Sequence, residues 1–465
     1  MSAAKAGLAP DRLLWTALAV LLGLAYALLP IVPGDSGVKA GFATVVVTVV
    51  LLATGMVPGL VTAGVFFFMA LVTQAAPVWV LASGFWSNAI MLIFGGLVMG
   101  AAAERSGFGR YVARGLMQRF LGSYPRLLTG IMLGTAALSL LVPSTMGRLA
   151  ITIPVVLATL KEAGYEEGSN GYVGAILVTV AGNFMTSYAI LPANLVQIIT
   201  LGAIEAVHGP QATYAEYLLL TGPVLGLAKG ATFIALVLWL LPASSPAPAS
   251  GPGEPVVLSG AARRLGLVLG LAVSMWATDF LHGLKPGWIA LGAGLLCILP
   301  PLALVGLKES FDRNRLTGIV TVPMLLGVAS VITHSGAGQV LIDAVTAAIP
   351  LAGRSPAYGF AVLAVLAAVI AIVATTVGCI AIMTPIVTQV VVATGLSAKL
   401  GAVAVLTGLQ ALFFHYEAAP VMVGLLMGRV GARPAARFLV PLAIIGLVLI
   451  LPLEILWLKL IGYLP

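Results

Sequence analysis

Charged side chains are scarce in this sequence. Only 8% of its 465 residues are charged and 60% are hydrophobic, whereas soluble domains have about 25% charged residues. The mean hydropathy of +1.12, together with recurring apolar runs, excludes a soluble protein because each run can cross a hydrocarbon core of about 30 Å. The sequence predicts a multi-pass membrane protein. Its net charge of +8 indicates an excess of Lys and Arg in the loops on one side of the membrane, not nucleic-acid binding.

Cysteines are few, and the usual catalytic motifs are missing. Cys297 and Cys379 both lie in apolar segments, which argues against a disulfide framework. The chain has no Gly-rich phosphate loop with Lys and Ser/Thr, no His cluster with metal-ligand spacing and no sign of a pore-lining ring. We therefore expect neither an enzyme, an ATP-driven pump nor a channel, and no cofactor. The first apolar segment lacks a cleavage site and is expected to remain as a helix.

Apolar runs predict an all-α fold of about eleven transmembrane helices with two re-entrant hairpins. Segments 127–160 and 356–395 are too long for one span and contain helix breakers, which predicts a hairpin in each. Segments 171–204 and 399–428 are interrupted at polar residues and prolines, which predicts discontinuous helices. The first is interrupted at Gly182-Asn183, Thr186-Ser187 and Leu191–Asn194. Single spans are expected at 12–32, 40–57, 60–80, 87–104, 217–242, 265–282, 286–306, 316–333 and 438–462.

The loops differ in charge. Residues 104–126 hold five arginines and read as an amphipathic helix on the cytoplasmic surface, because Lys and Arg accumulate on that side. Loops 161–169, 308–315 and 429–437 should be cytoplasmic, and loops 205–216 and 334–354 external. This places the N-terminus in the cytoplasm and the C-terminus outside. The Pro/Ser/Ala/Gly stretch 243–253 is the clear internal boundary.

A short motif occurs twice, once in each predicted hairpin. Ser144, Thr145, Gly147 and Pro154 match Thr375, Thr376, Gly378 and Pro385 at an offset of 231. A second pair, 106–109 and 335–338, precedes the hairpins at an offset of 229. The flank is Arg-rich in the first copy and Arg-poor in the second, which predicts repeats of opposite orientation. Inverted repeats with broken helices are typical of secondary transporters.

The two motifs predict the substrate and cation sites. The tip of a hairpin frees backbone groups, at Gly147 and Gly378 among others, and helix N-termini favour anions while C-terminal carbonyls favour cations. The candidate hydroxyls can donate to an oxyanion or accept around a cation, although they can also bond to their own helices. These hydroxyls belong to Ser144, Thr145, Thr375 and Thr376.

Further candidates lie in the helix breaks. The amides of Asn183 and Asn194 suit a sodium or substrate site, whereas His415 and Glu417 suit a proton. Glu417 is equally explained by a structural pair with His415 or with a backbone group. Arg148 either attracts an anionic substrate or reaches a helix C-terminus or the cytoplasmic water.

At these residues the chain resembles the divalent-anion/sodium symporter family. The run from Pro143 to Pro154 is similar to the tip of that family's first hairpin, and Leu191–Asn194 to its following turn. The segment Glu104–Gly107 resembles the family's segment before the hairpin. The tips differ from the family's Ser-Asn-Thr, since Thr145 and Thr376 stand at the Asn and Met146 and Val377 at the Thr. In the family those positions help to hold sodium and the substrate carboxylate.

The resemblance implies a sodium-coupled symporter of a small anion such as a di- or tricarboxylate, sulfate or sulfonate. It also implies a homodimer in the bilayer, here of a bacterial inner membrane, with an elevator-type transport domain. The alternatives are proton-coupled transport or exchange on the same fold through Glu417 and His415 and, more remotely, a membrane-embedded enzyme that uses this pair. The expected parts are 1–126 (scaffold), 127–204 (transport), 205–264 (span and linker), 265–355 (scaffold), 356–428 (transport) and 429–465 (last span).

Overall fold

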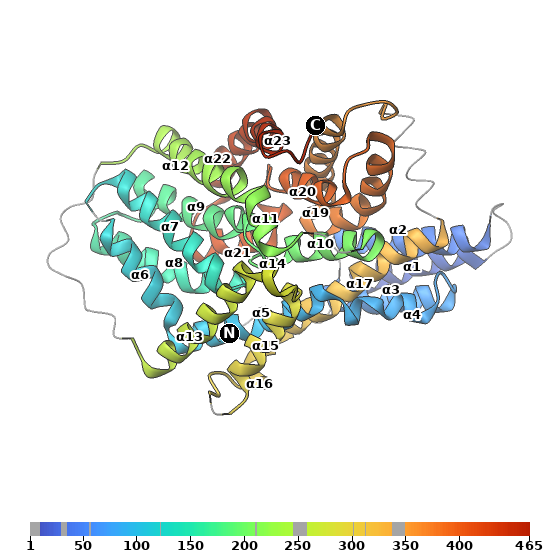
Figure 1. Cartoon of the computed structure of the whole chain (residues 1–465), viewed down its shortest axis with the longest axis horizontal. Coiled ribbons are helices and arrows are strands. Elements are labelled where there is room, and N and C mark those ends of the chain that lie inside the picture. Colours follow the sequence, from blue (N-terminus) through green and yellow to red (C-terminus); the bar gives the residue numbers. More distant parts are fainter. Residues whose placement is uncertain are drawn as a thin grey trace. The chain divides into compact units, whose positions relative to one another are not determined.

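The computed structural model describes residues 10–28, 35–54, 57–120, 122–209, 212–244, 258–300, 302–311, 313–336 and 349–465. These residues form helices and no strand (Figure 1), which confirms the predicted all-α fold. The chain divides into two compact units, which are described one at a time. Unit 1 comprises Met1–Ile90, Ile199–Gln211 and Arg313–Val405, and unit 2 comprises Met91–Ile198, Ala212–Asp312 and Leu406–Pro465.

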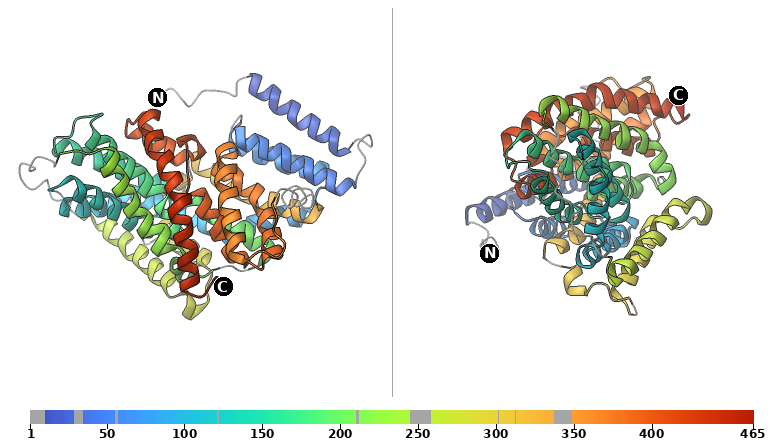
Figure 2. Two further views of the ribbon diagram at one scale, coloured as in Figure 1. Left: turned by 90° about the horizontal axis from the view of Figure 1, so that it is seen from above. Right: turned by 90° about the vertical axis from the view of Figure 1, so that its left-hand side faces the viewer.

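Unit 1 contains the first three helices of the chain and the second hairpin. Its elements are α1 (Pro10–Leu28), α2 (Ser36–Thr54), α3 (Gly59–Val72), α4 (Val78–Ala82), η1 (Ser83–Trp86), α17 (Arg313–Ser335) and α19 (Pro356–Thr394). Figure 2 shows α1 and α2 side by side, drawn in blue. Helices α3, α17 and α19 pack against α2, which makes α2 the centre of this unit. Three helices cross from one unit to the other: α5 (Asn88–Ser106), α10 (Leu195–His208) and α20 (Ala398–Leu409).

Helix α19 is a hairpin rather than one straight helix. The chain leaves helical geometry at Thr375, with φ 59° and ψ 168°. The arms then run back along each other, because Cys379 Sγ lies 3.4 Å from the carbonyl oxygen of Ala367 and Gly359 lies against Thr394. In a straight helix Gly359 and Thr394 would be about 52 Å apart. The predicted hairpin at 356–395 is therefore present.

Unit 2 contains the first hairpin, the break that follows it and the C-terminal helices. In Figure 1 helices α6 to α9 lie side by side, and they contact one another. The elements of this unit are α6 (Phe108–Arg119), α7 (Tyr124–Leu141), α8 (Thr145–Glu162), α9 (Asn170–Phe184), η2 (Thr186–Ala189), α11 (Tyr214–Thr221), η3 (Gly222–Ala228), α12 (Lys229–Leu240), α13 (Gly260–Ala277), α14 (Asp279–His282), α15 (Pro286–Ile298), α16 (Leu307–Ser310), η4 (His415–Glu417), α21 (Ala419–Met427), α22 (Ala432–Ile445), η5 (Gly446–Ile450) and α23 (Leu451–Leu460).

Three predicted boundaries are wrong. The span expected at 286–306 stops at Ile298, because Pro300 forces the preceding Leu299 into an extended conformation. The span expected at 60–80 ends at Val72 and is followed by a turn and the short α4. Helix α9 continues through Gly182 and Asn183, so that the break begins only after Phe184. The linker 245–253 and the second half of the 335–338 motif lie outside the described residues.

Loops that were predicted to lie on the same side of the membrane contact each other within unit 2. Arg429 and Glu167, both predicted to be cytoplasmic, form an ion pair at 2.8 Å. At the other end, the hydroxyl of Tyr463 donates to Glu216 at 2.9 Å, and both were predicted to be external. The contacts agree with the predicted loop order, while the orientation of the whole chain stays a prediction.

Two helices of unit 2 contain a π-helical segment. Segment η3 separates α11 from α12, and η5 separates α22 from α23. In η3 the amide of Lys229 donates to the carbonyl of Val224, five residues earlier. A π segment inserts an extra residue into a helical turn and often accompanies a functional site. Both segments fall inside helices that are long enough to span a membrane.

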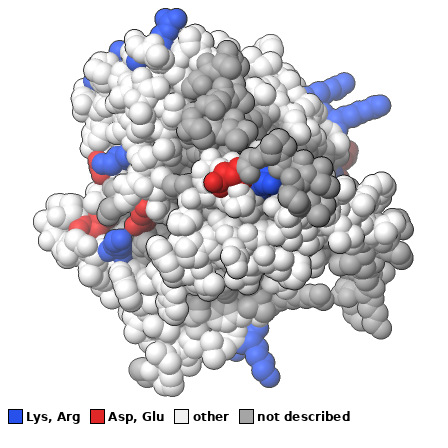
Figure 3. Space-filling view, turned by 90° about the vertical axis from the view of Figure 1, so that its right-hand side faces the viewer, with Lys and Arg blue, Asp and Glu red and all other residues white. Residues whose placement is uncertain are grey.

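Six stretches of described helix are long and apolar enough to cross a membrane, and seven further apolar helices are shorter. The long ones are Val78–Ser106, Tyr124–Leu141, Asn170–Ala189, Tyr214–Leu240, Pro356–Thr394 and Ala432–Leu460. Figure 3 shows one face of the molecule, on which Lys, Arg, Asp and Glu are few and uncharged residues cover most of the surface. A lipid environment explains why so much apolar surface is tolerated.

The hairpin in α19 predicts a cross-link. A Cβ atom on Gly359 would lie 3.2 Å from the Cβ of Thr394, so Gly359→Cys with Thr394→Cys should form a disulfide under mild oxidation once Cys297 and Cys379 are replaced by Ala. Loss of two free thiols, counted by thiol labelling and mass spectrometry, checks this. The control pair Val373→Cys with Thr394→Cys should stay reduced, and equal behaviour of the two pairs would contradict the hairpin.

Candidate functional site

The first hairpin tip is the three-residue break Val142–Ser144 between α7 and α8. Ser144 has an extended backbone, and its Oγ accepts a hydrogen bond from the amide of Gly147 at 3.2 Å. This is the N-cap arrangement that ends an apolar helix and begins the next. It leaves the amides of Thr145 and Met146, the first two of α8, as donors that a bound anion would take.

The second tip has the same local construction. Thr375 Oγ1 accepts from the amide of Gly378 at 3.5 Å, three residues on, as Ser144 does from Gly147. Thr375 also has a φ of 59°, a region that β-branched residues rarely enter. Such strain costs about 1–3 kcal/mol and concentrates at functional positions. The duplicated sequence motif is therefore a duplicated helix cap.

Arg148 ties the first tip to the break of the next helix. Its side chain is fully buried on α8. Nη1 donates to the carbonyls of Val142, at 2.7 Å, and of Ala193, at 2.8 Å. Nη2 donates to the hydroxyl of Thr145 at 3.2 Å and to the carbonyl of Asn183 at 2.7 Å. One guanidinium thus joins the end of α7, the start of α8, the end of α9 and the turn before α10.

These contacts explain how a buried charge is tolerated. All four partners of Arg148 are neutral oxygens, and among the described residues no carboxylate pairs with it. Hydrogen bonds to a charged group contribute about 1.5–3 kcal/mol each. Val142 follows the last residue of α7 and Asn183 lies in the last turn of α9, where helix dipoles favour a cation.

The break after α9 is held by its own polar residues. Asn194 Nδ2 donates to the carbonyl of Phe184 at 3.0 Å and to the hydroxyl of Ser187 at 3.1 Å, while its Oδ1 accepts from the amide of Val196. Asn183 Nδ2 donates to Thr152 on α8 at 2.8 Å. Both asparagines are buried, and Asn183 Oδ1 has no hydrogen-bond partner among the described residues. The predicted discontinuous helix is confirmed.

The second broken helix is interrupted between α20 and α21. Glu417 is buried in η4, and its Oε1 accepts from the amides of Phe413 and Phe414 at 3.0 and 2.7 Å. Its neighbour His415 is half-buried and packs edge-on against Tyr416. The carboxylate of Glu417 therefore stabilises the backbone of the break. This is the pairing with a backbone group that the sequence offered as one explanation of Glu417.

Two buried charges were missed in the sequence. Lys229, 1% exposed at the start of α12, donates from Nζ to the carbonyl of Gln410 at 2.8 Å, directly after α20. Glu454 is 0% exposed in α23, and its carboxylate oxygens have no hydrogen-bond partner among the described residues. The signal that would have found both is simple: each is a charge within an apolar run long enough to span the membrane.

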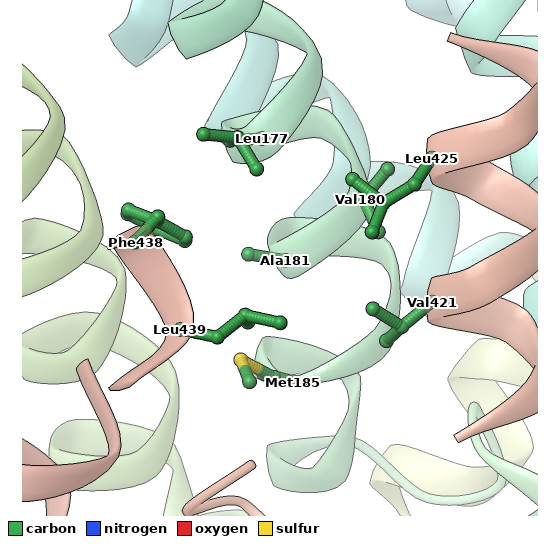
Figure 4. Close-up of a pocket in the computed structure, with 8 residues that line it drawn as sticks. All are labelled: Leu177, Val180, Ala181, Met185, Val421, Leu425, Phe438 and Leu439. Carbon is green, nitrogen blue, oxygen red and sulfur yellow. The ribbon is translucent and has the colours of Figure 1, made fainter. Parts of the chain in front are cut away.

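A small cavity in unit 2 does not suit an anion. Figure 4 shows side chains of α9, α21 and α22 pointing into it, among them Leu177, Val421 and Phe438. Every side chain that lines it is apolar, so it offers an anion neither a charge nor a hydrogen-bond donor. Cavities of this kind are packing defects between helices.

The structure gathers some of the predicted site residues and leaves others in separate places. In unit 1 the tip of α19 holds Thr375, Thr376 and Gly378, and in unit 2 η4 holds His415 and Glu417. The first tip and its neighbouring break in unit 2 hold Ser144, Thr145, Gly147, Arg148, Asn183 and Asn194. Their roles in binding substrate or cations stay predictions.

The chain is similar to known membrane proteins over most of its length. The family described as "Sodium:sulfate symporter transmembrane region" matches residues 12–464. A Cupriavidus necator protein described only as "Membrane protein" is 25% identical over 291 residues, which cover 60% of this chain and 56% of that relative, little more than half its length. The fold is similar to that of the Alcanivorax borkumensis YdaH transporter, whose crystal structure is described as having an unusual topology. That similarity has a TM-score of 0.57 and 15% identity, and covers 86% of this chain and 90% of the other.

The hydrogen bonds of Arg148 predict a large loss of stability in Arg148→Met. The carbonyl of Asn183 would lose its donor, and those of Val142 and Ala193 would keep only the amide of Ser144 and the hydroxyl of Thr145. Hydrogen bonds to a charged group contribute about 1.5–3 kcal/mol each, so the total loss is about 3 kcal/mol or more. Thermal unfolding of the purified protein in detergent should show a midpoint several degrees lower. Arg263→Met, at an exposed position on α13, serves as the control. Equal midpoints for the two variants would contradict the structural role of Arg148.

Proposed function

The chain belongs to the sodium:sulfate symporter family, and on that premise we propose that it carries a small oxyanion across a bacterial inner membrane together with sodium. It is an integral multi-pass transporter of the anion/sodium symporter type. Family members are transporters and not enzymes, so the membrane-embedded enzyme is set aside. The substrate classes in the proposal are sulfate, di- and tricarboxylates and sulfonates.

The observation that carries this proposal is the duplicated helix cap. Each tip starts a helix inside an apolar segment, and each holds a hydroxyl over the first helical turn, at Ser144 and at Thr375. A helix N-terminus combines amide donors with a positive dipole end, which suits an oxyanion without needing a free cationic side chain. Hydroxyls beside these amides add donors of the same kind.

The homodimer and the elevator movement that the resemblance implies belong to the same proposal. The parts proposed to move with the substrate are residues 127–204 and 356–428, which contain the hairpins and the broken helices. The proposed orientation has the N-terminus in the cytoplasm and the C-terminus outside, as the arginine distribution favours.

Uptake into proteoliposomes tests the function. Labelled sulfate, succinate, citrate and taurine are offered with an inward sodium gradient or with choline in its place, at one constant pH. We expect at least one anion to accumulate, and sodium to stimulate its uptake. If none of the anions is taken up or raises the unfolding temperature of the protein, the proposal fails. If a pH gradient alone drives uptake and Glu417→Gln abolishes it, the proton-coupled alternative replaces sodium coupling.

The capped tips predict the effect of removing one hydroxyl. A hydrogen bond from the hydroxyl to the anion contributes about 1 kcal/mol, so Ser144→Ala and Thr375→Ala should each lower kcat/KM for the transported anion by about fivefold. Ser144→Thr, which keeps the hydroxyl, should retain most of the activity. The matched controls are Ser139→Ala in α7 and Thr384→Ala in α19, whose hydroxyls bond only to their own helices. Controls that lose as much activity as the tip variants would contradict a role for the caps.

A further inference from the structure

Four oxygen atoms converge at the first helix break of unit 2. They are the carbonyl oxygens of Val142, Asn183 and Ala193 and the hydroxyl of Thr145, and we refer to them as the oxygen cage. They come from a hairpin tip, a helix end and a turn that are separate in the sequence. Carbonyl and hydroxyl oxygens from interrupted helices are the ligands with which transporters coordinate sodium. Thr145 and Asn183 are also two of the residues that the sequence predicted to hold a cation.

The cage already contains a cation, and it belongs to the protein. Nη1 of Arg148 donates to two of the oxygens and Nη2 to the other two, at 2.7–3.2 Å, so each oxygen has a donor on the guanidinium. The side chain is 0% exposed, so it has no water into which it could withdraw. A sodium ion at the same place would stand against a positive charge with the same ligands already used. The residues of the cage therefore do not fit sodium while Arg148 is present.

We propose that Arg148 is a resident cation that takes the place of a coupling sodium ion at this break. Any sodium that the transporter carries then binds elsewhere in the chain. Arginine keeps its proton at all physiological pH values, so the charge in the cage is permanent and does not depend on the ion gradient. The inference rests on the proposed function only for its transport measurements, since the occupancy of the cage is measured on the purified protein.

The second broken helix offers an independent parallel. There the carbonyl of Gln410, just past the end of α20, accepts from the buried ammonium of Lys229. Lys229 comes from α12 and Arg148 from α8, so the two arrangements arise from different elements. Both nevertheless place a cationic side chain on a carbonyl at the C-terminal end of an interrupted helix, where the dipole is negative. Both breaks in unit 2 thus have a buried basic side chain bonded to a carbonyl at a helix end.

The decisive experiment compares sodium chloride with choline chloride at equal ionic strength. The unfolding temperature in detergent is measured for the wild type, Arg148→Ala, Arg148→Lys and the surface control Arg263→Ala. Removing the guanidinium should open the cage, so sodium should raise the midpoint of Arg148→Ala by several degrees more than that of the wild type and the control. Low millimolar methylguanidinium should also stabilise Arg148→Ala, and Arg148→Lys should resemble the wild type. Equal sodium shifts in Arg148→Ala and the wild type would overturn the proposal.

A second variant decides the matter if Arg148→Ala does not fold. Thr145→Val removes one oxygen of the cage and leaves Arg148 in place. If sodium binds elsewhere, the sodium concentration for half-maximal effect on the midpoint or on uptake stays within twofold of the wild type. A tenfold rise would overturn the proposal, because it would place sodium on Thr145. A wild type that transports an anion without any response to sodium supports a filled cage and contradicts sodium coupling. If the wild type responds to sodium but transports none of the anions, the proposed function fails. The cage proposal then stands if sodium raises the midpoint of Arg148→Ala more than that of the wild type, and fails if the two shifts are equal.

Discussion

The structure of unit 2 depends on the hydrogen bonds of one buried guanidinium. Inside a membrane every backbone group needs a partner, and a helix that stops there leaves carbonyls unpaired. Arg148 donates to three carbonyls at two interruptions of the chain, one at the tip after α7 and two at the break between α9 and α10. Without it the carbonyl of Asn183 would require water or an ion, and those of Val142 and Ala193 would keep only the amide of Ser144 and the hydroxyl of Thr145. The tip and the break are therefore one connected structure rather than two local irregularities.

The same constraint explains why the breaks are so polar within such an apolar chain. Asn194 and Ser187 satisfy the end of α9, Glu417 satisfies the amides before η4, and Ser144 satisfies the start of α8. Each of these side chains lies at the helix break whose free backbone groups it hydrogen-bonds. Interrupted helices in a bilayer are accepted because their free ends bind something, and in this chain much of what they bind is the chain itself. What remains open for a ligand is set by what these side chains leave unused.

Much of this could be predicted from the sequence, and the reason is local. The length of the apolar runs predicted the helices, and the helix breakers within two over-long runs predicted the hairpins, whereas the helix caps at Ser144 and Thr375 became visible only in the structure. The hydrogen-bond partners of Arg148 could not be predicted from the sequence, because Asn183 and Ala193 lie 35 and 45 residues further along the chain. No sequence spacing reports that kind of convergence. Lys229 could have been found, because a single charge in the middle of the apolar run 217–242 is itself a signal, but its partner Gln410 lies 181 residues further along the chain.

The π-helical segment η3 sets the direction in which Lys229 points. One residue corresponds to about 100° of rotation around a helix, so the extra residue in the π turn decides which face of α12 is turned towards the interior. Lys229 follows this turn at once and is buried on the carbonyl of Gln410. A deletion of one residue in η3 would leave the composition of the span almost unchanged and yet turn the ammonium away from that carbonyl. The register of the helix, as much as the identity of its residues, is what keeps this charge inside the protein.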